Sequence, residues 1–482
     1  MITEGGLPPS LLSDESRGGD TNEGGLDFQM AVLMAQLPRW LAMDGFTMLI
    51  REASGDFEAQ FFVPGRGYLR EFFESKDHQV TPAEFWAEID QFKKFDYDKD
   101  REFQWFTLVS AGLSEGIRPV MNGLRRVRDP YGFYDAGSPV FAASYQAYVE
   151  VVEKLGRTAE DAAFLFTKVK VDPDWASARV RGAGNFKDAV GTELPQFANL
   201  PNRVLDEIYA GLGELVKAAR NTPVKRRDLE ERLRGLLLPA QPTVAPVRMH
   251  TTTTGEPPAA LRELIFSWER FFGGPERIYP PPAQWNEGLV RELHETKQWM
   301  LAHRVTRRVR LSGERRLSSS PAFGFVFSAV AGFAVEMVGR DGSVWATDDH
   351  ACATTPPYQV KEEGSFRQQT GRDLVVGISF VRDISAEVME AVSGFGLPCA
   401  PTLFLSGEAA VISAKQTNAI VMDLKKRVAR ALQTTHAQTI HLFFAGPAFV
   451  ALLLGHRLNA TAAVQCYEWT GHDRYVPTCL LS

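Results

Sequence analysis

The chain has little cysteine, and none of it is paired. Its 482 residues include four cysteines, Cys352, Cys399, Cys466 and Cys479, which are dispersed and form no CxxC pair. The sequence therefore has neither the paired spacing of a structural zinc site nor the many cysteines of a disulfide framework. We interpret the four side chains as reduced core thiols in a cytoplasmic protein.

Three further features are absent, and each excludes a class of function. No apolar run is long enough to span a bilayer and no signal peptide opens the chain, so we expect a cytoplasmic protein without a membrane partner. The formal net charge is only −6, so any contact with nucleic acid must come from a local patch. No GxGxxG fingerprint and no Walker loop occur, which argues against dinucleotide coenzymes and ATP.

What is present is typical of a globular protein with two or three domains, with 44% hydrophobic and 23% charged residues. Residues 1–25 are rich in Gly, Ser, Pro and acids, which predicts a disordered N-terminus. Residues 239–258 hold several prolines and a run of threonines, a composition typical of a linker. We therefore predict one domain at residues 26–238 and a second at residues 259–482.

The first domain shows a definite order of elements. Hydrophobic periodicity and turn residues predict a helix at 26–43, strands at 46–53, 56–63 and 68–78, a helix at 82–95, a strand at 103–111 and a helix at 115–128. Pro38 should kink or split the first helix. Further helices are predicted at 141–155, 159–168, 203–219 and 227–237. The basic clusters Arg125–Arg128 and Lys225–Arg227 are either phosphate contacts or solvated helix faces.

Carboxylates gather at neighbouring strand ends of this domain. Asp56 opens the second strand, and Glu74 and Lys76 share one face of the third because strand side chains alternate. Glu52 ends the first strand close by. Asp56 and Glu74 suit Mg²⁺ or Mn²⁺, which would polarise a scissile phosphate and activate water. Lys76 would orient that water or neutralise developing charge.

The triplet Glu74-Ser75-Lys76 has a second interpretation. A solvated ion pair on an exposed strand would give the same pattern, and Gln91-Phe92-Lys93 repeats it on a predicted helix. The position of the triplet on the third strand, with Asp56 on the second, favours catalysis. The α-β-β-β-α-β order and the residues Gln29, Glu52, Asp56, Glu74 and Lys76 resemble the core of the PD-(D/E)xK nucleases. That resemblance implies a metal-dependent endonuclease that cuts double-stranded DNA.

The predicted helices and strands of the second domain alternate, which indicates an α/β fold. We predict helices at 258–272 and 285–303, a strand at 307–311, a helix from Ser318 to residue 333, strands at 334–338, 343–347 and 374–381, a helix at 384–392, a strand at 399–405 and a helix at 411–433. The last stretch predicts a strand at 440–444, a helix at 448–458 and strands at 463–469 and 475–481. Two strand–loop–helix units, at 377–384 and 443–447, look like two Rossmann-like halves.

Ligands of such sheets bind beyond the carboxyl ends of the strands, where helix N-termini attract anions. Arg316 and the following serines suit phosphate, Trp345 could stack on a base, and Tyr467, Glu468 and Tyr475 could contact an adenine edge. The candidate ligand residues are Arg316, Ser318, Ser319, Ser320, Trp345, Ser379, Arg382, Ala445, Gly446, Pro447, Tyr467, Glu468 and Tyr475. Core packing would explain each aromatic residue equally simply, and a surface ion pair would explain Arg316.

The end of the chain holds an ordered set of features: His441-Leu442-Phe443, Ala445-Gly446-Pro447, Gly455, Leu458-Asn459, Tyr467-Glu468 and Tyr475. These features resemble the SAVED domain, the cyclic-nucleotide sensor of bacterial CBASS antiphage systems. It implies two fused CARF-like halves that bind a cyclic oligonucleotide, most often a cyclic trinucleotide of adenines, with a cyclic dinucleotide as the other option. The N-terminal stretch also looks like the endonuclease domain often fused ahead of SAVED.

The combined expectation is a two-domain antiphage effector. A cyclic oligonucleotide would activate an Mg²⁺-dependent nuclease, and self-association on ligand binding is the simplest switch, because binding can shift a population towards the assembled state. Two alternatives stay open. The N-terminal domain could be a non-catalytic adaptor, or the chain could be a Rossmann-like regulator unrelated to defence.

Overall fold

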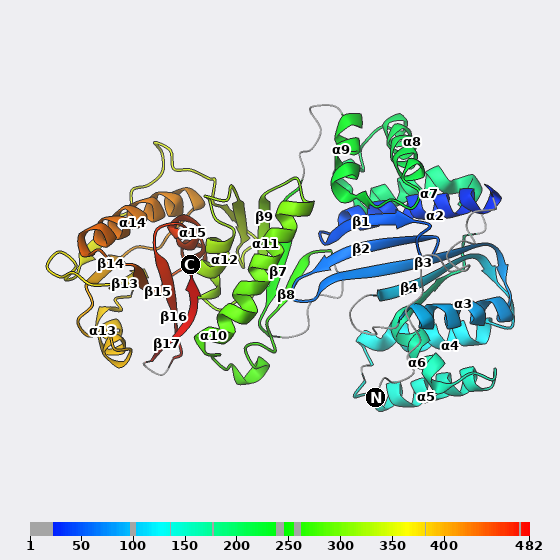
Figure 1. Cartoon of the computed structure of the whole chain (residues 1–482), viewed down its shortest axis with the longest axis horizontal. Helices are drawn as coiled ribbons and strands as arrows, with labels where there is room; N and C mark the ends of the chain where they lie inside the picture. The colour runs from blue at the N-terminus through cyan, green and yellow to red at the C-terminus, as the bar shows by residue number, and fades with distance from the viewer. Residues whose placement is uncertain are drawn as a thin grey trace. The chain divides into compact units, whose positions relative to one another are not determined.

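The computed structural model describes residues 23–96, 103–134, 136–175, 178–237, 245–254, 262–380, 382–471 and 474–482 (Figure 1). The chain forms two compact units, Met1–Pro242 and Thr243–Ser482, each with its own core. Residues 1–22 of the predicted disordered segment lie outside the described residues. No described helix is both long enough and apolar enough to cross a bilayer.

The N-terminal unit is built on one six-stranded sheet. Its first elements are α2 (Glu23–Ala42), β1 (Phe46–Arg51), β2 (Phe57–Val63), β3 (Gly67–Val80), α3 (Pro82–Phe95) and β4 (Phe103–Leu113), and the sheet is completed by β5 (Val169–Asp172) and β6 (Val224–Lys225). The strand order is β5-β4-β3-β2-β1-β6. β1, β2 and β3 are antiparallel neighbours, whereas β3, β4 and β5 run parallel. The predicted α-β-β-β-α-β order is confirmed.

Helices cover both faces of this sheet (Figure 1). On one face, α3 packs with α4 (Arg118–Arg128), α5 (Pro139–Glu153) and α6 (Ala159–Lys168) over an aromatic core. The other face carries α2, with α7 (Ala178–Glu193), α8 (Asn202–Ala218) and α9 (Arg226–Leu236) beyond it. The sequence pattern missed α7. α2 continues through Pro38 because Leu33, Leu37 and Trp40 are fully buried, so the predicted split is wrong.

Two basic residues of this unit have structural roles. Arg226 is buried and donates to the carbonyl oxygens of Leu41, at 2.8 Å, and Met43, at 2.6 Å, at the end of α2. Arg128 donates in the same way to the carbonyl of Leu165 in the last turn of α6 and to that of Val169 just after it. Because the last carbonyls of a helix have no intrahelical donor, the two guanidinium groups cap the ends of α2 and α6. Neither arginine is therefore a phosphate contact.

The C-terminal unit holds two sheets. The first has the order β11-β10-β9-β7-β8 and contains β7 (Val247–Thr252), β8 (Leu264–Ser267), β9 (Arg308–Gly313), β10 (Ala334–Val338) and β11 (Val344–Ala346). The second has the order β12-β14-β13-β15-β16-β17 and contains β12 (Lys361–Glu363), β13 (Asp373–Phe380), β14 (Thr402–Gly407), β15 (Thr439–Ala445), β16 (Ala463–Trp469) and β17 (Tyr475–Leu481). The helices are α10 (Pro282–Trp285), α11 (Arg291–His303), α12 (Ser319–Val326), α13 (Ser385–Gly394), α14 (Ala414–Thr435) and α15 (Ala448–Leu458).

Several predictions for this unit are wrong. The predicted linker at 239–258 includes β7, whose residues Val247, Met249 and Thr251 are buried at every second position. The predicted helix at 258–272 contains β8, which pairs in parallel with β7. Helix α12 ends at Val326, not at residue 333.

The two strand–loop–helix units do not belong to different halves. β13 and β15 are hydrogen-bonded parallel neighbours within one sheet, so both units lie in the second half. The first half is the sheet of β7 to β11. The predicted architecture of two Rossmann-like halves stands, but its boundary lies earlier in the chain.

The predicted cysteine environment is half right. Cys466 and Cys479 are buried on the neighbouring strands β16 and β17, as expected of core thiols. Cys352 and Cys399 are exposed, so for them the core prediction is wrong.

Helices α12 and α15 cross at two glycines. A Cβ added at Gly324 would lie 1.9 Å from the carbonyl oxygen of Leu452, and one added at Gly455 would lie 2.1 Å from that of Pro321. Only residues without a side chain allow the backbones to approach this closely. The crossing joins the helix that follows the first sheet's β9 to the helix that follows β15.

Candidate functional site

The N-terminal unit gathers polar side chains where β2 begins. Asp56 directly precedes β2, and its carboxylate is fixed on both sides. Gln29 Nε2 of α2 donates to Oδ1 at 2.6 Å, while the Ser75 backbone N–H donates to Oδ2 at 2.7 Å. The Ser75 hydroxyl donates to the same Oδ2. Three donors therefore set the orientation of the Asp56 carboxylate.

Glu74 and Lys76 lie on β3 beside Asp56, as predicted. Lys76 Nζ is 3.0 Å from Glu74 Oε1 and 2.8 Å from Glu88 Oε1 of helix α3. All three side chains are largely buried, with 19% of Glu74, 24% of Lys76 and 19% of Glu88 exposed. Sequence reasoning missed Glu88, because nothing in its helical context distinguishes it from a solvated glutamate.

The buried carboxylates resist ionisation. Desolvation raises the pKa of Asp56 to about 6, although the hydrogen bonds from Ser75 oppose the shift. Desolvation and the neighbouring Asp56 charge raise the pKa of Glu74 to about 8. Burial acts to lower the pKa of Lys76, but the charges of Glu74 and Glu88 outweigh it and hold that pKa above its usual range. The cluster is an ammonium surrounded by an excess of carboxylates.

Glu52 is not brought into this cluster. Its backbone has a φ of 54°, and its carboxylate accepts hydrogen bonds from Arg51, at 2.8 Å, and Arg220. The guanidinium groups hold the carboxylate against the end of α8, 168 positions away in the chain. Glu52 therefore has an ion-pair role here, and its catalytic assignment has no supporting contact.

The carboxylates of this cluster are possible ligands of a divalent cation. Within the described ranges, no group of three or more His, Cys, Asp or Glu side chains is arranged to hold a metal ion. Magnesium commonly uses only one or two carboxylates, with water and substrate phosphate completing the shell. Asp56 and Glu74 offer such a pair: burial raises the pKa of both carboxyl groups, and the Asp56 charge raises that of Glu74 further. The residues present therefore fit an ion held by two carboxylates.

These shifts predict how stability depends on pH without metal. A carboxyl group whose pKa is raised by folding stabilises the fold below its unfolded pKa, near 4, and loses that contribution as pH rises through the folded value. With EDTA present, the free energy of unfolding should fall on the order of a few kcal/mol between pH 5 and pH 8.5, since one pKa unit corresponds to about 1.4 kcal/mol. Urea denaturation at the two pH values measures it. Glu74→Gln should flatten the dependence, and an equal slope in that variant would contradict the assignment.

In the C-terminal unit, three parallel strands end together. Ser379 of β13 is in register with Ala445 of β15, and Glu468 lies near the end of the next strand, β16. Gly446 and Pro447 follow and lead into α15. This edge is the ligand-binding side of an open α/β sheet. The structure therefore brings together Ser379, Ala445, Gly446, Pro447 and Glu468 as predicted.

The turn before α12 meets the same edge. Glu468 Oε1 accepts from the backbone N–H of Leu317 at 3.2 Å, and Oε2 accepts from that of Ser318 at 2.7 Å. The hydroxyls of Ser319 and Ser320 are buried and make no hydrogen bond within the described structure. Burial raises the pKa of Glu468, although hydrogen bonds from Ser318 and from the Leu317 backbone oppose the shift. Glu468 thus caps the turn, and its predicted contact with an adenine edge stays a prediction.

Arg316 lies on the aromatic side of that turn. Its guanidinium carbon is 4.9 Å from the ring centroid of Tyr279 and 5.3 Å from that of Phe272. These cation–π contacts position a positive charge beside the serines. The phosphate role predicted for Arg316 stays a prediction; in this structure its charge acts on the nearby Glu468 carboxyl, whose pKa it lowers against the effect of burial.

Of the remaining aromatic candidates, Tyr467 and Tyr475 are buried in the core and Trp345 is half-buried. Tyr467 stacks on Phe443 with ring centroids 4.1 Å apart, and its hydroxyl meets His441 Nδ1 at 2.8 Å. Tyr475 packs edge-on to Phe443 and is buried beside α13. Trp345 packs edge-on to Phe449 at the start of α15. In this structure Tyr467 and Tyr475 take part in core packing, and their predicted base contacts stay predictions.

Arg382 forms an ion pair with a glutamate of α13. Its NH1 and NH2 groups form a bidentate ion pair with Glu387 of α13, at 2.7 and 3.0 Å. Its guanidinium also lies 5.4 Å from the ring centroid of Trp469. A ligand phosphate would have to displace Glu387, so Arg382 is a weaker candidate than Arg316.

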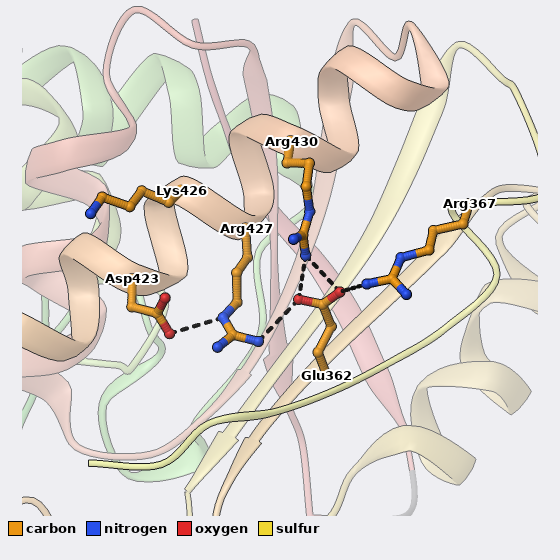
Figure 2. Close-up of a pocket in the computed structure, with 6 residues that line it drawn as sticks. All are labelled: Glu362, Arg367, Asp423, Lys426, Arg427 and Arg430. Atoms are coloured by element: carbon orange, nitrogen blue, oxygen red, sulfur yellow. Dashed lines mark hydrogen bonds and ion pairs between the residues drawn. The ribbon is translucent and has the colours of Figure 1, made fainter. Parts of the chain in front are cut away.

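A charged pocket of about 450 Å³ opens between α14 and β12 (Figure 2). The Glu362 carboxylate accepts from Arg430 at 2.6 Å, Arg367 at 2.8 Å and Arg427 at 3.0 Å. Figure 2 shows the guanidinium groups converging on this single carboxylate, with Lys426 pointing away. The network ties edge strand β12 to α14, and it includes none of the predicted ligand residues.

Residues 292–481 match the SAVED family. Its model is described as the "SMODS-associated and fused to various effectors sensor domain". The SAVED segment begins within α11 and includes the three strand ends and the turn before α12. The resemblance of the last stretch to SAVED is thereby confirmed.

Two similar proteins align with this chain over nearly its full length. "CD-NTase-associated protein 4" of Acinetobacter sp. and that of Moraxella osloensis are each 24% identical, over 487 and 485 residues, or 99% of this chain and 100% of the relative. The Acinetobacter baumannii Cap4 SAVED/CARF-domain containing receptor, solved with the cyclic trinucleotide 2'3'3'-cAAA, is 22% identical with a TM-score of 0.79. That match covers 94% of this chain and 98% of the receptor. The corresponding Moraxella osloensis receptor is 23% identical, covers 95% and 100%, and has a TM-score of 0.79. The chain therefore shares the fold of these receptors, which confirms the predicted fold class.

Proposed function

We propose that this chain is an antiphage effector of the CBASS type, in which a cyclic oligonucleotide bound by the SAVED segment activates a metal-dependent endonuclease in the N-terminal unit. The observation that carries the proposal is the convergence of Asp56, Glu74 and Lys76 in an α-β-β-β-α-β unit joined to a SAVED segment. A cyclic trinucleotide is the favoured activator, because a similar receptor was solved with one. The substrate would be double-stranded DNA in the cytoplasm.

Each residue of the N-terminal cluster has a role in this proposal. Asp56 and Glu74 would hold Mg²⁺ or Mn²⁺, and the bound ion would polarise the scissile phosphate and lower the pKa of water. Gln29 and Ser75 hold the Asp56 carboxylate in one orientation. The Lys76 ammonium would stabilise negative charge that develops on the phosphate.

A plasmid-cutting assay tests the proposal directly. Purified protein should cut supercoiled DNA only when Mg²⁺ and a cyclic trinucleotide are both present, and EDTA should stop the reaction. A panel of cyclic di- and trinucleotides identifies the activator by binding and by cutting. Ligand binding without cutting would support the adaptor alternative. Binding of none of these ligands would favour a regulator unrelated to defence.

Arg316→Ala should weaken activation. Losing one charge-assisted phosphate contact typically costs about 1.5–3 kcal/mol, or roughly one to two decades of affinity. The ligand concentration for half-maximal cutting should rise accordingly, while the maximal rate is unchanged because Arg316 is in the other unit. Calorimetric titration of the ligand provides the measurement. An unchanged Kd would exclude Arg316 from the phosphate contacts.

Ligand should also drive self-association. A silent nuclease that becomes active on ligand binding needs a switch, and assembly of several chains is the simplest one. Sedimentation velocity of the Lys76→Ala protein, with and without saturating ligand, measures it. The ligand should raise the sedimentation coefficient. Full activation of the parent protein as an unchanged monomer would point instead to release of an inhibitory contact within one chain.

A further inference from the structure

Glu88 is held rigidly beside the nuclease cluster. The capping box between Thr81 and Glu84 sets the start of α3, and Phe85 and Ile89 on either side of Glu88 are fully buried. A helix fixed at its end and along its apolar face cannot rotate without breaking this core. The Glu88 carboxylate is consequently directed at β3 and not at solvent.

The Lys76 ammonium is shared between two carboxylates from different elements. Its distances are 3.0 Å to Glu74 Oε1 on the same strand and 2.8 Å to Glu88 Oε1 on α3. If Glu88 were absent, Glu74 would be the only carboxylate within ion-pair distance of Lys76 among the described residues. The ammonium would then have Glu74 as its one ion-pair partner in the described structure and would compete with any cation for that carboxylate.

We propose that Glu88 is a positioning residue of the nuclease site, which holds the Lys76 ammonium on the α3 side so that Glu74 remains available to a divalent cation. The inference rests on the proposed nuclease function and deepens it. Glu88 acts through Lys76 and need not touch metal or DNA. Partners that orient a metal-site residue in this way typically contribute 10–100-fold to metal affinity or activity.

Two substitutions and one control test the proposal in the full-length chain. Glu88→Gln keeps the shape but removes the charge, and Glu88→Asp keeps the charge on a shorter side chain. Asp90→Asn is the matched control, because Asp90 lies on the same helix but pairs with Arg157 at an exposed site. Each protein is saturated with cyclic trinucleotide, and plasmid cutting is followed over a range of Mg²⁺ concentrations. Mn²⁺ binding without DNA is measured separately by electron paramagnetic resonance.

Glu88→Gln should raise the half-saturating Mg²⁺ concentration about 10-fold or more and weaken Mn²⁺ binding by a similar factor. The KM for DNA should not change. Glu88→Asp should recover part of the loss, and Asp90→Asn should match the parent. The proposal is overturned if Glu88→Gln lowers only thermal stability, or if Asp90→Asn shows the same shift. Failure of the parent protein to cut DNA would instead refute the proposed function, and the Mn²⁺ measurement distinguishes the two outcomes.

Discussion

Lys76→Ala should reduce ligand-activated DNA cleavage about 100- to 1,000-fold, the loss expected when a preorganised group that stabilises developing charge is removed. Lys76 is the cation that lies beside Glu74 and Glu88 in the N-terminal cluster. Its removal should leave cyclic-nucleotide binding unchanged, because the SAVED segment belongs to the other unit. Cleavage rates and ligand titrations on the same preparation measure both properties.

The chain offers a matched control for this substitution. Lys93 ends the triplet Gln91-Phe92-Lys93, which repeats the sequence pattern of Glu74-Ser75-Lys76, but it lies on α3 and pairs with Asp161 at 2.9 Å. Lys93→Ala should retain parental cleavage at a small loss of stability. Complete plasmid digestion by the Lys76→Ala protein would show that the catalytic cluster lies elsewhere.

Gly455→Ala should destabilise the C-terminal unit strongly. The new Cβ would lie 2.1 Å from the carbonyl oxygen of Pro321, and backbone cannot move aside as a flexible side chain can. Overpacking of a core typically costs about 1–3 kcal/mol, and a clash with backbone belongs at or above the upper end. Urea denaturation should show an early transition for the C-terminal unit, accompanied by loss of ligand-activated cleavage.

The control for this prediction is Gly394→Ala at the end of α13. No heavy atom lies within 4 Å of a Cβ built at Gly394, so that substitution should be neutral or stabilise the helix by roughly 0.5–1 kcal/mol. Wild-type stability in Gly455→Ala would mean that α12 and α15 can separate at little cost. Their crossing would then not be the contact that holds the two halves together.

Local sequence patterns were sufficient to predict much of the N-terminal unit. Alternation along one strand places Glu74 and Lys76 on the same face wherever that strand lies, and the turn residues around Asp56 set where β2 begins. The order of elements followed from periodicity for the same reason. The SAVED segment was recognisable because several small and aromatic residues occur in a fixed order near the end of the chain.

Contacts between elements that are distant in sequence could not be predicted from these local patterns. Glu88 faces Lys76 because Phe85 and Ile89 are buried in the core and set the rotation of α3. Glu52 lies outside the cluster because it pairs with Arg220, which is distant in sequence. Tyr467 could equally have faced a ligand or a core, and Phe443 on the neighbouring strand buries it. Sequence periodicity determines which side chains share a face of one element, whereas only the packing of elements decides what that face contacts.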